Sequence, residues 1–211
     1  YQSSPVIDLP FPVIFYGLEY DFITVNTNGW IAFGSSEMKS FRNTPIPGPG
    51  GPSPMLSVFW DDLTTGNVYY DYNEELNSFI IQWSDMHTYE YESPVSFQAI
   101  IFGNNGPSES GDNDIIIQYL EFNNTSSGYY PSSYSYPTHG GHATIGVENE
   151  SANIGLQYTY NNEYPMEAAE LNDRSAIHIT TRPSLNIIQA DQRSGLPGMV
   201  VHFSINENYS F

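Results

Sequence analysis

The chain has 211 residues and a formal net charge of −19, from 24 Asp and Glu against five Lys and Arg. Nucleic acids and anionic membranes are bound by clustered cations, so this charge excludes both as partners. It favours a solvated extracellular surface or affinity for cations. There is no cysteine, which excludes a disulfide framework and thiol chemistry. The hydrophobic fraction is 39%, and with 17 Tyr and 12 Phe it is enough for a core built from strands.

The sequence contains no segment that predicts membrane insertion. No apolar run reaches the 18 residues of a spanning helix. The opening residues, YQSSPVIDLPFPV, lack the basic and apolar regions of a signal peptide, so we expect any such peptide to have been removed already.

Two extended segments, residues 21–27 and 30–34, meet at Asn28-Gly29. An Asn-Gly pair is typical of a type I′ hairpin turn, because both central residues need a positive φ. A two-residue turn of this kind would place Val25 opposite Ala32.

A loop rich in proline and glycine follows this hairpin, and it can be neither helix nor inner strand. Order resumes at Met55–Trp60, an apolar run long enough for a buried strand, which stops on two adjacent carboxylates. Three tryptophans lie inside strand patterns, and we expect them in or near the core: Trp30, Trp60 and Trp83.

The other predicted strands are short runs separated by turn residues, at intervals of about ten residues. They are residues 10–17, 67–72, 78–83, 95–102, 114–122, 143–148, 155–160 and 175–181. Residues 166–171 are the one plausible helical turn, and no longer amphipathic helix or fixed-period repeat is present. This pattern predicts an all-β fold, a mostly antiparallel β-sandwich with long loops and a C-terminal strand pair.

We expect two units, a sandwich domain at residues 1–183 and a tail at residues 184–211. After Arg182-Pro183 the pattern restarts with LNIIQA and MVVHFSI on either side of a turn, like the opening of an immunoglobulin-like or PKD-like module. A lone hairpin is at best marginally stable in water. The tail is therefore predicted to lie outside the core of its own domain. It either packs on this domain's edge, opens a following module, or is donated as a strand to a neighbouring copy.

Seven motifs follow one another along the chain: VNTNGWIAFG, FWDDL, FQAIIFGNNG, DIIIQY, ATIGVEN, GLQYTYN and RSAIHITTRP. Together they resemble the nidogen-type (NIDO-like) extracellular β domain, as found in large secreted bacterial surface proteins. The resemblance covers residues 11–183. It implies a β domain in an extracellular or cell-surface setting, and it carries no catalytic residues that map onto this chain.

Two carboxylate pairs are candidate metal ligands. Asp61 and Asp62 follow a buried strand, and Asp112 and Asp114 alternate in a polar loop. Ca²⁺ takes six to eight oxygen ligands, so these residues suggest calcium as a cofactor. The alternative for the first pair is one turn-capping and one solvated carboxylate, and for the second a plain solvated loop.

His139 and His142 could chelate a metal through two imidazoles. Without cysteines or a paired HExxH spacing, a flexible loop that happens to hold two histidines is the favoured interpretation.

The tyrosine-rich insertion holds the candidate ligand-binding residues, Tyr129, Tyr130, Tyr134 and Tyr136. Tyrosine presents a flat apolar face and a polar tip, which suits sugar rings and protein partners. The alternative is that these rings lie back over the sandwich and close an open edge.

These observations predict a non-enzymatic adhesion or binding module of a secreted or cell-surface protein. Its partner would be a glycan or a protein on a surface. One alternative is a structural subunit of an extracellular fibre, assembled by strand exchange between neighbouring copies. Another is an accessory domain of a secreted hydrolase.

Overall fold

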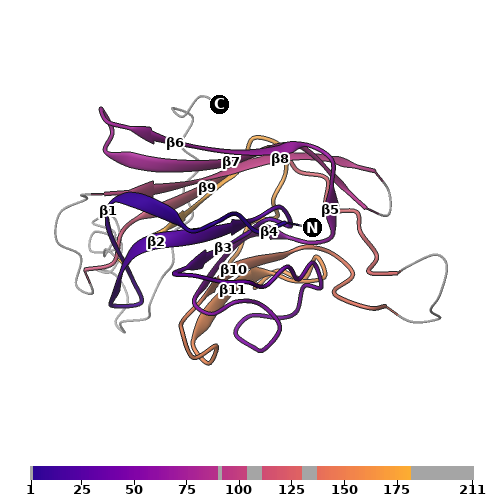
Figure 1. Cartoon of the computed structure of the whole chain (residues 1–211). Helices are drawn as coiled ribbons and strands as arrows, with labels where there is room; N and C mark the ends of the chain where they lie inside the picture. The colour runs from indigo at the N-terminus through magenta and orange to yellow at the C-terminus, as the bar shows by residue number, and fades with distance from the viewer. Residues whose placement is uncertain (1, 90–91, 104–110, 130–136, 182–211) are drawn as a thin grey trace, which may run out of the picture.

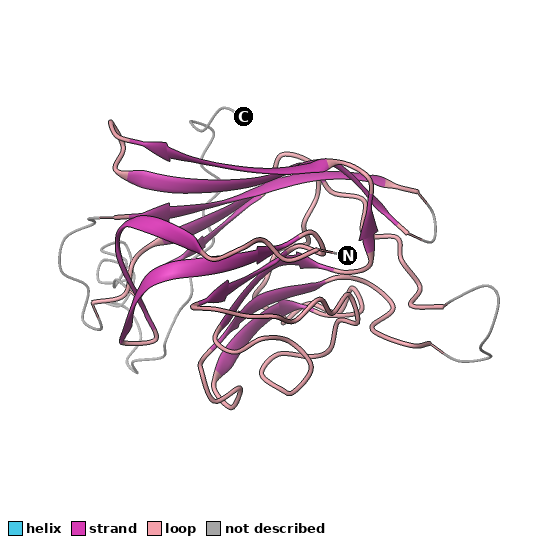
Figure 2. Ribbon diagram, in the orientation of Figure 1, coloured by secondary structure: helices cyan, strands magenta, loops and turns pink. Residues whose placement is uncertain are grey.

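Two antiparallel sheets face each other in the computed structural model of the chain (Figures 1 and 2). The structure describes residues 2–89, 92–103, 111–129 and 137–181. Within these ranges the structure has strands and no helix. Consequently, the described part of the chain offers no helix with the length and apolarity to cross a membrane. The predicted fold class, an all-β antiparallel sandwich, is confirmed.

The first sheet has six strands in the order β1-β2-β3-β4-β10-β11. Their bounds are β1 Ile7–Phe15, β2 Leu18–Asn26, β3 Trp30–Phe33, β4 Met55–Trp60, β10 Thr144–Glu148 and β11 Gly155–Thr159. The second sheet follows the order β12-β9-β8-β7, and both β5 and β6 pair with β7. Their bounds are β5 Leu63–Thr64, β6 Asn67–Asn73, β7 Ser78–Thr88, β8 Pro94–Phe102, β9 Ile115–Glu121 and β12 Ala176–Ile179.

The hairpin between β2 and β3 has a register one residue away from the predicted one. Val25 pairs with Ile31 rather than Ala32, so the loop holds three residues instead of two. Gly29 has a φ of 79°, and its N–H donates to the Asn26 carbonyl at 3.2 Å. This arrangement is a type I turn followed by a left-handed glycine, a common three-residue hairpin.

The β2–β3 turn is enclosed by the end of β4. A Cβ atom on Gly29 would lie 1.9 Å from the Phe59 carbonyl oxygen. The N–H groups of Val58 and Phe59 both donate to the Gly29 carbonyl at 3.0 Å. The side chain of Asn28 is fully buried, and its Oδ1 accepts the Leu63 N–H at 3.1 Å. Only glycine allows this approach of two backbones.

Aromatic side chains join the two sheets across the main core. Trp83 and Tyr119, from the second sheet, are fully buried. The Trp83 Nε1 donates to the Asn26 carbonyl at 2.9 Å, and the Tyr119 hydroxyl donates to the Val58 carbonyl at 2.6 Å. Burial raises the pKa of Tyr119 well above its ordinary value, so this hydroxyl stays a donor.

A second apolar cluster covers the outer face of the first sheet. It consists of Trp30, Ala32, Ile46, Met55 and Trp60. Both Trp30 Nε1 and Trp60 Nε1 donate to the Ser40 carbonyl, at 2.9 Å and 3.1 Å. The proline-rich loop therefore packs on β3 and β4, which explains why all six residues of β4 are buried. The three tryptophans are buried as predicted.

A carboxylate helps to hold the proline-rich loop in place. Glu148, in β10, is buried and accepts hydrogen bonds from the Gly48 N–H at 3.1 Å and the Ser53 hydroxyl at 3.0 Å. Burial raises the pKa of Glu148, although the two hydrogen bonds act in the opposite direction.

Two further expectations concern residues 166–171 and the tail. Residues 166–171 contain a turn instead of a helical segment, closed by a hydrogen bond from the Ala168 N–H to the Pro165 carbonyl at 2.9 Å. The tail, residues 184–211, lies outside the described residues, so its predicted strand pair stays a prediction.

Candidate functional site

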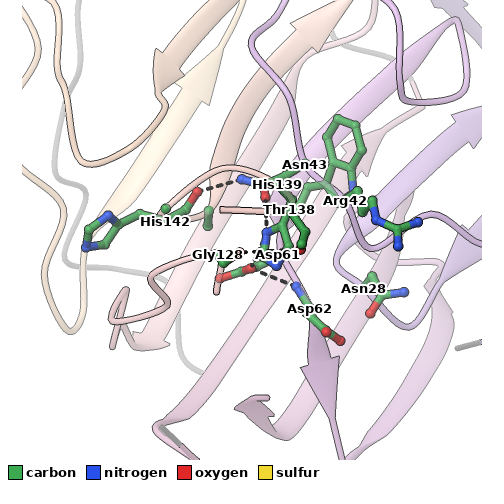
Figure 3. Close-up of polar contacts among 12 residues, drawn as sticks. Asn28, Arg42, Asn43, Asp61, Asp62, Gly128, Thr138, His139 and His142 are labelled. Atoms are coloured by element: carbon green, nitrogen blue, oxygen red, sulfur yellow. Dashed lines mark hydrogen bonds and ion pairs between the residues drawn. The ribbon is translucent and has the colours of Figure 1, made fainter. Parts of the chain in front are cut away.

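The two carboxylates that follow β4 are enclosed by protein. Asp61 is 0% exposed and Asp62 is 2% exposed. The Asp61 Oδ1 accepts the Asp62 N–H at 2.7 Å and lies 3.8 Å from the His139 Nδ1 (Figure 3). The expectation that one of the pair is solvated is therefore wrong, since both side chains are buried.

Asn43 joins this region to the proline-rich loop. Its side chain is fully buried and lies at the centre of the hydrogen bonds in Figure 3. The Asn43 Nδ2 donates to the His142 carbonyl at 2.6 Å and to the Thr144 Oγ1 at 3.1 Å. The Asn43 Oδ1 lies 2.9 Å from the His139 Nδ1. One neutral amide thus holds residues about a hundred positions apart in the chain.

The same network closes the base of the tyrosine-rich insertion. The Thr138 N–H donates to the Gly128 carbonyl at 2.8 Å, which brings the two ends of the insertion together (Figure 3). A Cβ atom on Gly128, which has a φ of 74°, would lie 2.6 Å from the Gly140 carbonyl oxygen. The Gly140 N–H in turn donates to the Asn43 carbonyl at 3.0 Å. We call residues 129–137, between these two ends in the sequence, the tyrosine loop.

The two histidines lie in unlike surroundings. The His139 side chain is 3% exposed, and the Phe41 ring meets its ring edge-on at 5.7 Å. His142 is half-buried, and burial lowers its pKa, which favours the neutral ring. His139 is therefore a packed part of the network, in contrast to the flexible loop that the sequence favours.

The second carboxylate pair lies near the other end of β2. The Asp112 Oδ1 accepts the Gly17 N–H at 2.8 Å, in the turn that precedes β2. The Asp114 Oδ1 accepts the Thr180 hydroxyl at 2.7 Å, and its Oδ2 lies 3.6 Å from the His178 Nε2. These carboxylates connect the β9 end to the β1–β2 turn and to β12.

The two candidate calcium pairs therefore do not share one site. Asp112 contacts the residue before β2, whereas the Asp61 N–H donates to the carbonyl of Asn28, which follows β2. Within the described ranges, no group of three His, Asp or Glu side chains is placed to hold a metal ion. Backbone carbonyls also bind Ca²⁺, so calcium binding by either pair stays a prediction.

One of the four candidate tyrosines is described. Tyr129 is 42% exposed at the start of the tyrosine loop. Tyr130, Tyr134 and Tyr136 lie outside the described residues, so the choice between a ligand surface and an edge cover stays open for them.

The comparison with protein families agrees with this architecture. The model of the family described as NIDO related matches residues 2–186. The chain belongs to this family. The match confirms the resemblance drawn from the motifs, and the family suggests an extracellular domain. Neither the curated proteins nor the solved structures contain a match to it.

Little in the sequence predicts the hydrogen-bond network around Asn43 in the NIDO-related domain. Asn43 stands between Arg42 and Thr44 at the start of a proline-rich loop, where asparagine is an ordinary turn residue. The pairing of Asn43 with Thr144 spans 101 residues. The one available signal is the pair His139 and His142, which the sequence favours as part of a flexible loop and which both contact Asn43.

Proposed function

We propose that this NIDO-related domain is a non-enzymatic adhesion or binding module of an extracellular or cell-surface protein. Its ligand, a glycan or a protein, contacts the tyrosine loop. The family supports the extracellular setting, and the charge of −19 supports a solvated surface.

The closed base of the tyrosine loop is the observation that carries this proposal. Gly128 and Thr138 are joined by a hydrogen bond, and the next residue, His139, has a 3% exposed side chain whose Nδ1 lies 2.9 Å from the Oδ1 of the buried Asn43. A loop that leaves a fixed base loses less conformational freedom on binding than one with free ends. Tyrosine adds large contact area with few rotatable bonds.

The test compares the same substitution, tyrosine to alanine, at positions inside and outside the tyrosine loop. Tyr134→Ala and Tyr129→Ala should each reduce binding of the labelled domain to a printed glycan array or to intact cells. Tyr69→Ala, on the exposed strand β6, is the matched control and should bind normally. If the Tyr134 variant melts early, the loop is structural and the proposal loses its surface. If all three variants bind equally, the ligand contacts another face.

A cleft at one side of the sandwich favours a second candidate, the fibre subunit. This cleft, of about 60 Å³, lies between β9 and β12 of one sheet and β10 and β11 of the other. Its lining is mostly apolar and includes Leu156 and Ile179. Since β11 and β12 end their sheets, a strand from residues 184–211 of a neighbouring copy could pair there and fill the cleft.

Light scattering and thermal melting separate the two candidates. The full chain is compared with a chain ending at Pro183. Self-association of the full chain, with a stable monomer after truncation, would support the fibre. If both chains are monomers and the truncated chain melts at a much lower temperature, the tail packs on its own domain. The fibre hypothesis should then be dropped.

A further inference from the structure

A groove of about 360 Å³ lies at the opposite side of the sandwich from the apolar cleft. Its floor contains Ile7, Val25 and Ile81, which are all buried. One bank is the N-terminal arm, residues 2–5, and the other is the strand β6 with Tyr70. We call it the β6 groove, and Figure 1 shows β6 at the outer edge of its sheet.

The N-terminal bank of the β6 groove is fixed by backbone hydrogen bonds. The Ser4 N–H donates to the Val25 carbonyl at 2.8 Å, and the Val25 N–H donates to the Ser4 Oγ at 3.0 Å. The Thr27 N–H donates to the Gln2 carbonyl at 2.9 Å. The arm therefore continues the first sheet beyond β1, and the groove is formed before any ligand arrives.

Tyr70 points into the groove, whereas Tyr69 points away from it. Tyr70 pairs with the buried Ile81, while Tyr69 pairs with Gln82, and directly opposed residues share a face of the sheet. Tyr70 is nevertheless 58% exposed, because the groove leaves its side of β6 uncovered. Its ring lies 5.7 Å from the Phe79 ring, which supports it from one side.

The polar groups around the floor are neutral. The residues that line the groove carry no charged side chain. Two polar side chains on its banks, Gln2 and Tyr70, make no hydrogen bond to any part of the chain that the structure describes. One amide and one phenol are thus available as donors and acceptors.

We propose that the β6 groove binds a neutral sugar ring of a glycan. The apolar face of the ring lies on Tyr70, and the sugar hydroxyls exchange hydrogen bonds with the amide of Gln2. An apolar floor with a few neutral polar groups is the usual composition of such a small-molecule site. The net charge of −19 disfavours sulfated or uronic-acid glycans, because they would be repelled by the protein.

This site is independent of the tyrosine loop, so each can fail without the other. The experiment titrates the full chain with neutral oligosaccharides of glucose, galactose, mannose and N-acetylglucosamine, followed by calorimetry and by amide NMR shifts. A sulfated oligosaccharide is the charge control. We expect a neutral sugar to bind and to shift the amides of β6 and residues 2–5.

The adjacent tyrosines supply a matched pair of variants, since Tyr69 is 57% exposed and Tyr70 is 58% exposed on the same strand. Tyr70→Ala should weaken binding by about tenfold or more, as expected for an aromatic contact residue. Tyr69→Ala should leave it unchanged, and Gln2→Ala should weaken it less than Tyr70→Ala does.

Two results would overturn the proposal. One is the absence of binding by every neutral sugar at millimolar concentration. The other is equal loss of sugar binding in the Tyr69 and Tyr70 variants, because Tyr69 points away from the groove and its loss should not matter.

Discussion

The β2–β3 hairpin lies inside the sandwich, whereas the β6–β7 hairpin lies at the edge of its sheet with one side in solvent. The first turn places Gly29 against the backbone of Phe59, and Asn28 is fully buried. The second turn, residues 74–77, is mostly exposed and follows the exposed strand β6. Turn residues therefore decide where the chain reverses, but the place of the hairpin in the sheet decides whether it packs or remains available to a ligand.

The largest expected effect comes from adding one methyl group to the enclosed turn. Gly29→Ala should cost about 4 kcal/mol of unfolding free energy or prevent folding, because its Cβ overlaps a carbonyl oxygen. Asn77→Ala, at a φ of 44° in the exposed turn, should cost only about 1–2 kcal/mol. Denaturant titration measures both, and comparable losses would contradict the contrast between the two hairpins.

The same contrast predicts the effects of removing aromatic side chains. Trp60→Ala should cost about 3–5 kcal/mol, because it leaves a cavity in the cluster under the proline-rich loop. Tyr69→Ala removes an exposed ring and should change stability by less than about 0.5 kcal/mol. Thermal melting of both variants checks this, and a folded, near-native Trp60 variant would show that the outer cluster is dispensable.

Removing the hydrogen bonds of Asn43 should have a smaller effect on the free energy of unfolding. Asn43→Ala removes the buried hydrogen bonds that this amide makes with the His142 carbonyl and with His139, at a cost of about 1–3 kcal/mol. Asn123→Ala, which removes one exposed hydrogen bond to the Pro94 carbonyl, is the control and should be nearly neutral. If the Asn43 variant is also neutral, the base of the tyrosine loop does not depend on this amide.

Calcium should stabilise the protein if either carboxylate pair binds it. At a free concentration ten times the Kd, a single site adds about 1.4 kcal/mol by mass action on the folded state. Asp62→Asn would remove this stabilisation if Asp61 and Asp62 bind the ion. Asp112→Asn would remove it if Asp112 and Asp114 bind the ion. An equal shift of the melting midpoint with NaCl at matched ionic strength means screening alone. No change on adding EDTA would exclude the site.

The smallest effect concerns the pH dependence of stability. Burial raises the pKa of Glu148 above 4.5, so the folded state holds this proton more tightly than the unfolded chain does. The contribution of Glu148 is therefore greatest below pH 4.5 and is lost as the pH rises through the raised pKa. Glu148→Gln should thus gain stability over the parent protein between pH 4 and pH 7. The exposed Glu167→Gln is the control, and parallel curves for both would contradict this assignment.

Much of the sandwich could be predicted because its strands have local signals. The run Met55–Trp60 has the bounds of β4, and the hairpin of β6 and β7 follows from alternation around a polar turn. The two-residue strand β5 is too short to carry any pattern. The register at Gly29 differs because the Asn28 side chain accepts a hydrogen bond from Leu63, and an Asn-Gly pair does not reveal that contact.

The candidate sites were less predictable because they depend on contacts between distant segments. Alternation places Tyr70 on the inner face of β6, but it cannot show that the facing sheet leaves that ring uncovered. The Asn43 network depends on contacts between segments far apart in the chain, and no local sequence pattern predicts such contacts. The sequence leaves one of the two carboxylates in solvent because His139, which lies 3.8 Å from Asp61, comes almost eighty residues later in the chain.

The enclosed Asn28-Gly29 turn has a consequence for how the molecule ages. In a loose chain the Gly29 nitrogen can attack the Asn28 side-chain carbonyl and release ammonia, which converts the asparagine to an aspartate or isoaspartate. In the fold, that nitrogen donates to the Asn26 carbonyl, and the Asn28 Oδ1 accepts the Leu63 N–H. The damage therefore accumulates only while the chain is unfolded. The carboxylate it creates would have to refold into a fully buried position beside Asp61, so each long excursion from the native state tends to be irreversible.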